Sequence, residues 1–242
     1  MAGKWITERL HDAYETSYAA SEVLFETQTG QQTLTLYQNP KFGRMLALDG
    51  VTQVTEADEF IYHEMLTHVP VLAHGSAKSA LIIGGGDGGM LEELLKHRTI
   101  ERVVMVEIDQ GVIDFSVKYL PTISNGAFDD ARAEIVIADG ATYMAEATET
   151  FDIIIVDSTD PIGPGEVLFT EQFYGNCRAR LNAGGVIVTQ NGVPFVQGAE
   201  LTQTMLAFER IFASRTCYTA TIPTYTGGPM AFGWGSDNPS LL

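Results

Sequence analysis

The sequence predicts an α/β protein with a mostly parallel seven-stranded sheet, preceded by a small antiparallel β-domain. From about residue 79 onward, short apolar runs alternate with amphipathic runs, which is typical of parallel strands joined by crossover helices. A glycine-rich segment, 84–89, follows the apolar run 80–83 and opens an amphipathic run. The first 55 residues instead contain short β-prone runs separated by turn signals. We therefore expect two domains, 1–55 and 56–242.

Composition narrows the functional classes. The chain has 242 residues with 45% hydrophobic and 19% charged residues, which is typical of a folded globular protein. No apolar run approaches the roughly 20 residues that span a bilayer, and no signal-peptide pattern opens the chain, so we expect a cytoplasmic protein. Two distant cysteines indicate neither a disulfide framework nor a zinc site. The net charge of −17 argues against nucleic-acid binding and would favour cationic small molecules, although solubility alone also explains it.

The amino-terminal region predicts strands and then a helix. Asp49-Gly50 between two β-prone runs is a strong hairpin signal. The segment 55–58 resembles a capping box and predicts a helix that ends near Pro70. His63 and His68 lie on this helix five residues apart, a spacing that does not place two zinc ligands on one helix face. The expected strands in this region are 21–28, 31–38, 43–48 and 51–55.

The remaining strands are expected at regular intervals between helical patterns. The last two form a closing pair around the segment 223–228. The seven strands are 81–83, 102–106, 133–138, 151–156, 185–189, 217–222 and 230–234.

Acidic residues follow several of these strands. In an open parallel sheet the ligand lies beyond the carboxyl ends of the strands, where Asp87, Glu107, Asp139 and Asp157 are expected to meet. Gly84-x-Gly86-x-x-Gly89 followed by Glu107 fits a nucleotide-binding fingerprint, in which the acid binds a ribose. A glycine-rich turn between packed elements is the plainer interpretation, Asp139 suits a helix cap, and Glu107 could be solvated. Asp87 places a negative charge in the turn where a phosphate would otherwise bind, and it would repel that phosphate. We therefore expect a cationic ligand.

The segment 157–165 is the candidate chemistry-bearing loop. Two prolines and two glycines predict a rigid departure from the sheet, flanked by the carboxylates of Asp157 and Asp160. No nearby histidine or second acid cluster completes a metal shell, so we predict no metal. Carboxylates bind an ammonium group well, and a partly buried one is able to take a proton from it. A turn capped by aspartate is the alternative.

Together these segments resemble the spermidine synthases, the polyamine aminopropyltransferases, from about residue 10 to about residue 237. The resemblance implies an amino-terminal β-domain and a methyltransferase-like Rossmann domain. It also implies transfer of an aminopropyl group from decarboxylated S-adenosylmethionine, a co-substrate, to putrescine, without a cofactor. The segments that carry the resemblance are Gly84-Gly85-Gly86-Asp87-Gly88-Gly89, Val106-Glu107-Ile108-Asp109, Ala138-Asp139-Gly140, Asp157-Ser158-Thr159-Asp160-Pro161 and Asp58-Glu59-Phe60-Ile61-Tyr62-His63-Glu64-Met65.

The resemblance also implies roles for individual residues. Asp157 corresponds to the base that deprotonates the attacking amine. The implied donor-binding residues are Gln32, Asp87, Glu107, Asp139, Gly140 and Pro164. The implied diamine-binding residues are Tyr62, His63, Asp87, Asp157, Asp160 and Tyr225, with Gln53 and Gln190 as further contributors.

Two other classes remain open from the sequence. An N-methyltransferase would use S-adenosylmethionine, whose carboxylate Asp87 would repel; a non-catalytic polyamine- or nucleoside-binding relative is the second alternative. A nicotinamide dehydrogenase would leave the carboxylates unexplained. The resembled family forms dimers or tetramers and continues past the position of Asp237 with a Tyr-Tyr-Asn and a later histidine, whereas this sequence ends at Leu242. Acceptor length is not determined, because a hydrophobic pocket distinguishes one methylene by only about 1–3 kcal/mol.

Overall fold

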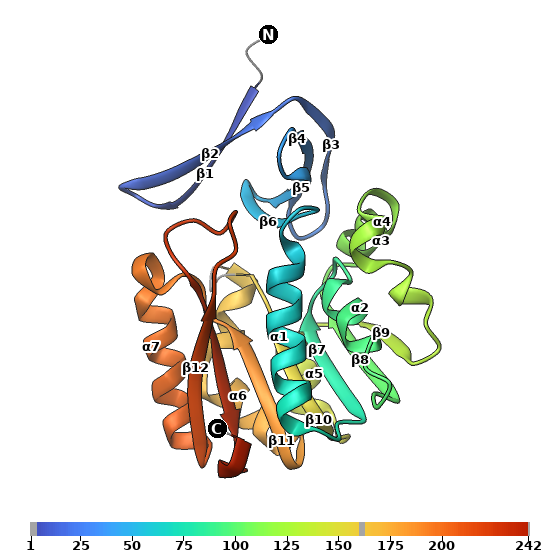
Figure 1. The fold of residues 1–242 in the computed structure, drawn as a ribbon, viewed down its shortest axis with the longest axis vertical. Coiled ribbons are helices and arrows are strands. Elements are labelled where there is room, and N and C mark those ends of the chain that lie inside the picture. The colour runs from blue at the N-terminus through green and yellow to red at the C-terminus, as the bar shows by residue number, and fades with distance from the viewer. Residues whose placement is uncertain (1–3, 160–162, 242) are drawn as a thin grey trace.

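A seven-stranded sheet with helices on both faces forms the larger part of the molecule, as predicted, and six antiparallel strands lie at one end of it (Figure 1). The computed structural model describes residues 4–159 and 163–241. The helices are α1 (Glu59–His74), α2 (Gly89–Leu95), α3 (Gln110–Tyr119), α4 (Pro121–Ser124), α5 (Gly140–Glu146), α6 (Glu171–Ala179) and α7 (Pro194–Ile211). Short 3₁₀ turns lie at η1 (Ala127–Asp129), η2 (Gly163–Phe169) and η3 (Pro239–Leu241).

The large sheet has the strand order β12-β13-β11-β10-β7-β8-β9, and only β13 runs antiparallel to its neighbours. The predicted closing pair is therefore correct. Each strand matches its predicted run to within a few residues. The strands are β7 (Ser79–Gly84), β8 (Arg102–Glu107), β9 (Ala133–Ile137), β10 (Phe151–Asp157), β11 (Leu181–Gln190), β12 (Ser214–Ala220) and β13 (Met230–Ser236).

Alternate residues of the central strands bury opposite faces, because successive side chains point to opposite sides of a sheet. Ile82 and Ile155 pack with α1 and α2, whereas Leu81 and Ile154 pack with α5, α6 and α7. Strands buried on both faces read as continuous apolar runs, which explains Ile153-Ile154-Ile155-Val156. This rigid core fixes the strand ends that carry the acidic residues.

The amino-terminal strands form a four-stranded sheet, β3 (Glu22–Gln28), β4 (Thr33–Asn39), β5 (Gly43–Leu48) and β6 (Val51–Thr55), as predicted. A hairpin of β1 (Lys4–His11) and β2 (Tyr14–Ala20) precedes it and was not predicted. Tyr18 and Ala20 of β2 pack in an apolar cluster with β4 and β5, but the first residues of β2 and Trp5 of β1 are exposed, so the hairpin shows little of the apolar alternation that identifies half-buried strands. Leu34 and Leu46 join the four-stranded sheet to α3 through a shared apolar cluster.

Helix α1 corrects two expectations. Asp58 precedes the helix, but neither the predicted capping box nor any side-chain cap forms; Thr55 Oγ1 instead donates to Asp58 Oδ1 at 2.6 Å. The helix also continues through Pro70 to His74. A proline removes one backbone donor, but Pro70 and Val71 are both buried, and that burial stabilises the continued helix. No described helix combines the length and the apolar character needed to cross a membrane.

Candidate active site

A cavity of about 350 Å³ lies between the carboxyl ends of the large sheet and the amino-terminal strands. Both parts of the chain line it, including Leu46 and Leu48 of β5 and the turn after β7. The predicted site residues that line it are Gln32, Tyr62, His63, Asp87, Glu107, Asp139, Gly140, Asp157 and Tyr225, together with Gln53 and Gln190.

The turn after β7 brings the neighbouring strand close. Gly84 has φ of 89°, in the left-handed region, and a Cβ there would lie 2.0 Å from the backbone oxygen of Asp157. Only glycine accommodates both constraints. The turn thereby sets Asp87 and Asp157, the acids that follow two paired strands, on one side of the cavity.

Glu107 ends β8 as a buried carboxylate. Its Oε1 accepts a hydrogen bond from the backbone nitrogen of Asp109 at 2.9 Å. Burial raises the pKa of Glu107 to about 7, although backbone hydrogen bonds oppose the shift. The alternative of a solvated Glu107 side chain is therefore wrong. Asp109 in turn caps α3 and accepts from Thr29 Oγ1 at 2.6 Å and from Gln32 Nε2 at 3.4 Å, which ties the amino-terminal sheet to this end of the cavity.

Asp139 both caps a helix and lines the cavity. Its Oδ1 accepts from the backbone nitrogen of Thr142 at 2.7 Å, at the start of α5. The capping interpretation is thus correct, and the residue still borders the space that Glu107 faces. Gly140 follows, where a Cβ would lie 2.5 Å from Ile83.

Asp157 lies at the end of β10, close to Tyr62 and Tyr225. Tyr62 of α1 donates a short hydrogen bond to Asp157 Oδ1. The Tyr62 and Tyr225 rings meet edge to face, 5.7 Å apart, and the Tyr225 hydroxyl donates to the backbone oxygen of Gln53. Burial and the nearby Asp87 raise the pKa of Asp157 to about 6. A carboxylate with that pKa is suited to accept a proton near neutral pH.

His63 and Asp87 form a charged pair near Asp157. His63 Nδ1 lies 2.5 Å from Glu59 Oε2, and His63 Nε2 lies 3.4 Å from Asp87 Oδ2. Asp87 Oδ1 also accepts from the backbone nitrogen of Gly89 at 2.9 Å. Burial opposes the charge of His63, but the surrounding carboxylates outweigh it, so the pKa of His63 lies well above its usual range. The pKa of Asp87 is lowered, because His63 and the Gly89 amide outweigh burial.

Some predicted residues have other contacts or lie outside the described chain. Gln190 Nε2 donates to the backbone oxygen of Ser158 at 2.9 Å and its Oε1 accepts from Gly192, so its amide braces the loop after β10. Asp160 lies outside the described residues. Pro164 belongs to η2, and its side chain is not described.

Sequence reasoning missed several residues that complete the site. Glu8 of β1 and Gln197 of α7 line the cavity but carry no motif. Asp58 Oδ2 accepts from both the backbone nitrogen and Oγ1 of Thr224, at 2.9 and 2.8 Å, and so holds the loop that carries Tyr225. Asp58 was assigned only to a capping box, and its contact with Thr224 joins segments far apart in the chain, so no local pattern pointed to this role.

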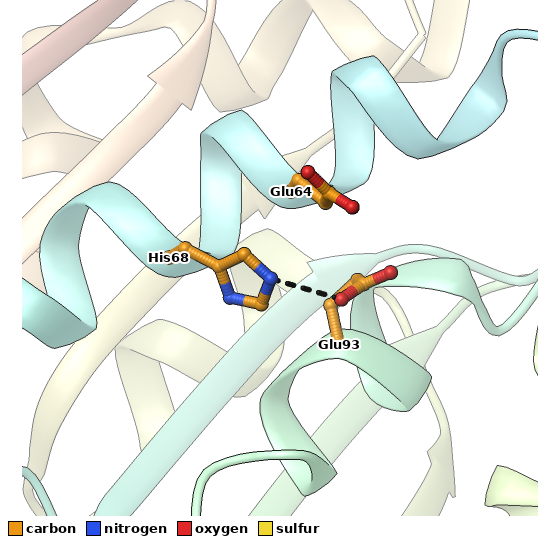
Figure 2. Close-up of side chains that lie close together, drawn as sticks. All are labelled: Glu64, His68 and Glu93. Atoms are coloured by element: carbon orange, nitrogen blue, oxygen red, sulfur yellow. Dashed lines mark ion pairs between the residues drawn. The ribbon is translucent and has the colours of Figure 1, made fainter.

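A separate cluster on α1 and α2 offers metal-ligating atoms: Glu64, His68 and Glu93 (Figure 2). Glu64 and His68 share a helix face, a spacing that the sequence reasoning did not weigh. Glu93 already pairs with His68 Nε2 at 3.0 Å and with Lys96 Nζ at 2.7 Å, and His68 Nδ1 lies 2.9 Å from His97 Nε2. These contacts already engage His68 and Glu93.

The fold and the acids around its glycine turn are typical of a nucleoside-binding site that favours positively charged ligands. Residues 59–241 match the family described as the spermine/spermidine synthase domain, and residues 4–56 match the spermidine synthase tetramerisation domain. The chain belongs to this family of polyamine aminopropyltransferases.

Relatives and solved structures agree. The chain is 63% identical to the polyamine aminopropyltransferase of Ruegeria sp. over 232 residues, covering 96% of this chain and 82% of the relative. It is 54% identical to polyamine aminopropyltransferase 1 of Pseudomonas aeruginosa, covering 97% and 82%. A spermidine synthase in complex with the transition-state analogue AdoDATO superposes with a TM-score of 0.95 at 39% identity, covering 99% and 82%. The spermidine synthase of Thermotoga maritima gives 0.92 at 37%, covering 99% and 81%.

Proposed function

We propose that this enzyme transfers the aminopropyl group of decarboxylated S-adenosylmethionine to putrescine. The amine nitrogen forms a bond to the aminopropyl carbon beside the sulfonium, and the carbon–sulfur bond breaks. The products are spermidine and methylthioadenosine, and the proton of the attacking amine passes to Asp157. The observation that carries this proposal is the pair of carboxylates, Asp87 and Asp157, which line the same cavity at the ends of neighbouring strands.

The donor is assigned to the side of the cavity formed by β8, β9 and the amino-terminal sheet. Glu107 accepts the ribose hydroxyls, supported by its burial at the end of the second strand. Asp139 and Gly140 contact the adenine, Pro164 packs against the base, and Gln32 reaches the donor from the amino-terminal sheet. Asp87 binds the donor's ammonium. This assignment is supported by the lowered pKa of Asp87, which keeps the carboxyl ionised: burial raises the pKa, but the contacts with His63 and the Gly89 backbone lower it by more.

The acceptor is assigned to the side formed by α1, β10 and the segment after β12. Tyr62, His63 and Tyr225 line the proposed diamine groove, and Gln53 and Gln190 border it. Asp160 is assigned to the diamine from the family resemblance alone. Asp157 receives the proton, supported by a pKa raised by burial to about 6. A sulfonium makes the adjacent carbon electrophilic without help, so the chemistry needs no cofactor. Alignment of the amine behind that carbon supplies roughly 7–11 kcal/mol of the barrier reduction.

The charge at Asp87 also separates this proposal from its alternatives. The carboxylate of S-adenosylmethionine would face Asp87 and be repelled, which disfavours methyl transfer. A non-catalytic binder would not need the raised pKa of Asp157.

We further propose a homo-oligomer, a dimer or tetramer, supported by the match of residues 4–56 to the tetramerisation domain. A division into domains 1–55 and 56–242 is supported by the separate sheets. A cytoplasmic location is supported by two free cysteines, Cys177 and Cys217.

Methylthioadenosine release tests the function. Purified protein is given decarboxylated S-adenosylmethionine with putrescine, cadaverine or spermidine, and S-adenosylmethionine serves as the control donor. We expect release with the decarboxylated donor and putrescine. Methylation with the control donor, or binding of methylthioadenosine without turnover, would instead support one of the alternatives.

A further inference from the structure

Glu59 has no role in the assignment above, yet it contacts a residue of the site. It is the first residue of α1, and its Oε2 lies 2.5 Å from His63 Nδ1, one helical turn later. The Glu59 side chain is 18% exposed and that of His63 only 2% exposed, so water screens the pair weakly. The contact lies on the side of His63 opposite Asp87.

The surroundings of His63 suit a ring in which both nitrogens carry a proton and act as hydrogen-bond donors. Its two ring nitrogens face two different carboxylates, Glu59 Oε2 and Asp87 Oδ2. A neutral imidazole has one N–H and one lone pair, so one carboxylate would face a lone pair in a buried place. An imidazolium donates to both. The charged groups that face this ring are Glu59 from α1, Asp87 from the turn before α2, and Asp157 from β10.

The glycine after the turn lets the ring take this position. A Cβ on Gly89 would lie 2.2 Å from His63 Cε1 and Nδ1, so no other residue fits beside it. The ring therefore lies directly against the start of α2, where Asp87 Oδ1 accepts from the Gly89 backbone nitrogen. Movement of His63 would change the surroundings of Asp87.

We infer that Glu59 is a positioning residue that keeps His63 charged, and that the charged His63 in turn holds the Asp87 carboxylate ready for the ammonium of the donor. This inference rests on the proposed function of Asp87. Two carboxylates, Asp87 and Asp157, border the same cavity. The charged His63 ring lies between Asp87 and Glu59. Without the charge on His63, Asp87 would compete with Asp157 for a proton.

The variant Glu59→Gln tests the inference, with Glu64→Gln, an exposed position on the same helix, as the matched control. Glutamine retains a hydrogen-bond acceptor for Nδ1 but not the charge. We expect kcat/KM for the donor at pH 8 to fall by about tenfold, because a charge-assisted contact is weakened. Binding of methylthioadenosine, which lacks the ammonium, should stay within twofold.

The pH dependence distinguishes positioning from a general packing defect. The ratio of variant to wild-type kcat/KM for the donor should recover below about pH 6.5, where an imidazole takes up a proton without Glu59. An equal loss at every pH, or an equal loss of methylthioadenosine binding, would overturn the inference.

Nitrogen-15 NMR of histidine-labelled protein without substrates gives a readout that does not depend on activity. In the wild type both His63 ring nitrogens should remain protonated at pH 8, and in Glu59→Gln the ring should lose a proton as the pH rises from 6 to 8. A neutral His63 in the wild type at pH 8 contradicts the inference even if Glu59→Gln does not fold. A charged wild-type ring in a protein without transferase activity would instead count against the proposed function alone.

Discussion

The two sides of the cavity are built differently. On the donor side, Glu107 accepts from a backbone nitrogen two residues later, and Asp139 from one three residues later. On the acceptor side, Tyr62 meets Asp157 across 95 residues, and Tyr225 meets Gln53 across 172. The donor carboxylates are therefore held by their own strand ends and helix starts, whereas Tyr62, Asp157 and Tyr225 on the acceptor side are held by contacts between distant segments.

This difference separates binding from proton transfer. Carboxylates held by local backbone donors keep their geometry when a neighbouring element shifts. The pKa of Asp157 depends on burial by α1 and on charges from Asp87 and His63, which belong to other segments. We therefore expect substitutions on the donor side to change affinity, and substitutions on the acceptor side to change turnover or the use of the amine.

The largest expected effect is on turnover. Asp157→Asn removes the proton acceptor, and kcat should fall by about 10²–10⁴-fold in steady-state assays of methylthioadenosine release. In the wild type, kcat should also decline as the pH falls below about 6, because Asp157 becomes protonated. Asp114→Asn, an exposed position on α3, is the control, and near-wild-type turnover in Asp157→Asn would rule out the base assignment.

Asp87→Asn should have the next largest effect. The neutral amide forfeits a charge-assisted contact with the donor ammonium, so KM for the donor should rise by about 10–100-fold. Methylthioadenosine affinity, measured by calorimetry, should stay nearly unchanged because the product lacks that ammonium. An equal loss of both affinities would show that Asp87 acts by shaping the turn instead.

Glu107→Gln should weaken methylthioadenosine binding by about tenfold, because a carboxylate accepts the ribose hydroxyls better than an amide. In the wild type, the affinity should decline as the pH falls through about 7, where Glu107 takes up a proton. Calorimetry at several pH values should show a flatter profile in Glu107→Gln. The exposed Glu101→Gln is the control, and a profile that persists in Glu107→Gln would assign the titration elsewhere.

Tyr225→Phe should have the smallest effect. It removes a neutral hydrogen bond to the Gln53 backbone oxygen and leaves the ring, so KM for putrescine should rise by about 2–10-fold. The donor KM should not move. Tyr143→Phe, which loses a hydroxyl contact with Glu149 outside the cavity lining, is the control. A larger change in the donor KM than in the putrescine KM would contradict the assignment of Tyr225 to the acceptor side.

The same difference explains what the sequence could predict. Glu107 and Asp139 follow apolar runs directly, so their positions at the sheet edge were predictable from strand periodicity alone. Glu59 and Thr224 follow no apolar run, and spacing gave no reason to select His63. The role of His63 depends on Asp87, and that of Thr224 depends on Asp58, and each partner lies in a distant segment. The β1–β2 hairpin was missed for a related reason. Its buried apolar residues, Tyr18 and Ala20, pack against the later strands β4 and β5, and most of its other residues are exposed.

The most direct test of the division measures two quantities on one variant. For Asp157→Asn, calorimetry gives the Kd of methylthioadenosine, and steady-state assays give kcat with putrescine. The account predicts a Kd within about twofold of the wild type, beside a kcat lowered by at least about 100-fold. A Kd weakened in proportion to kcat would contradict it, because the two sides of the cavity would then act as one.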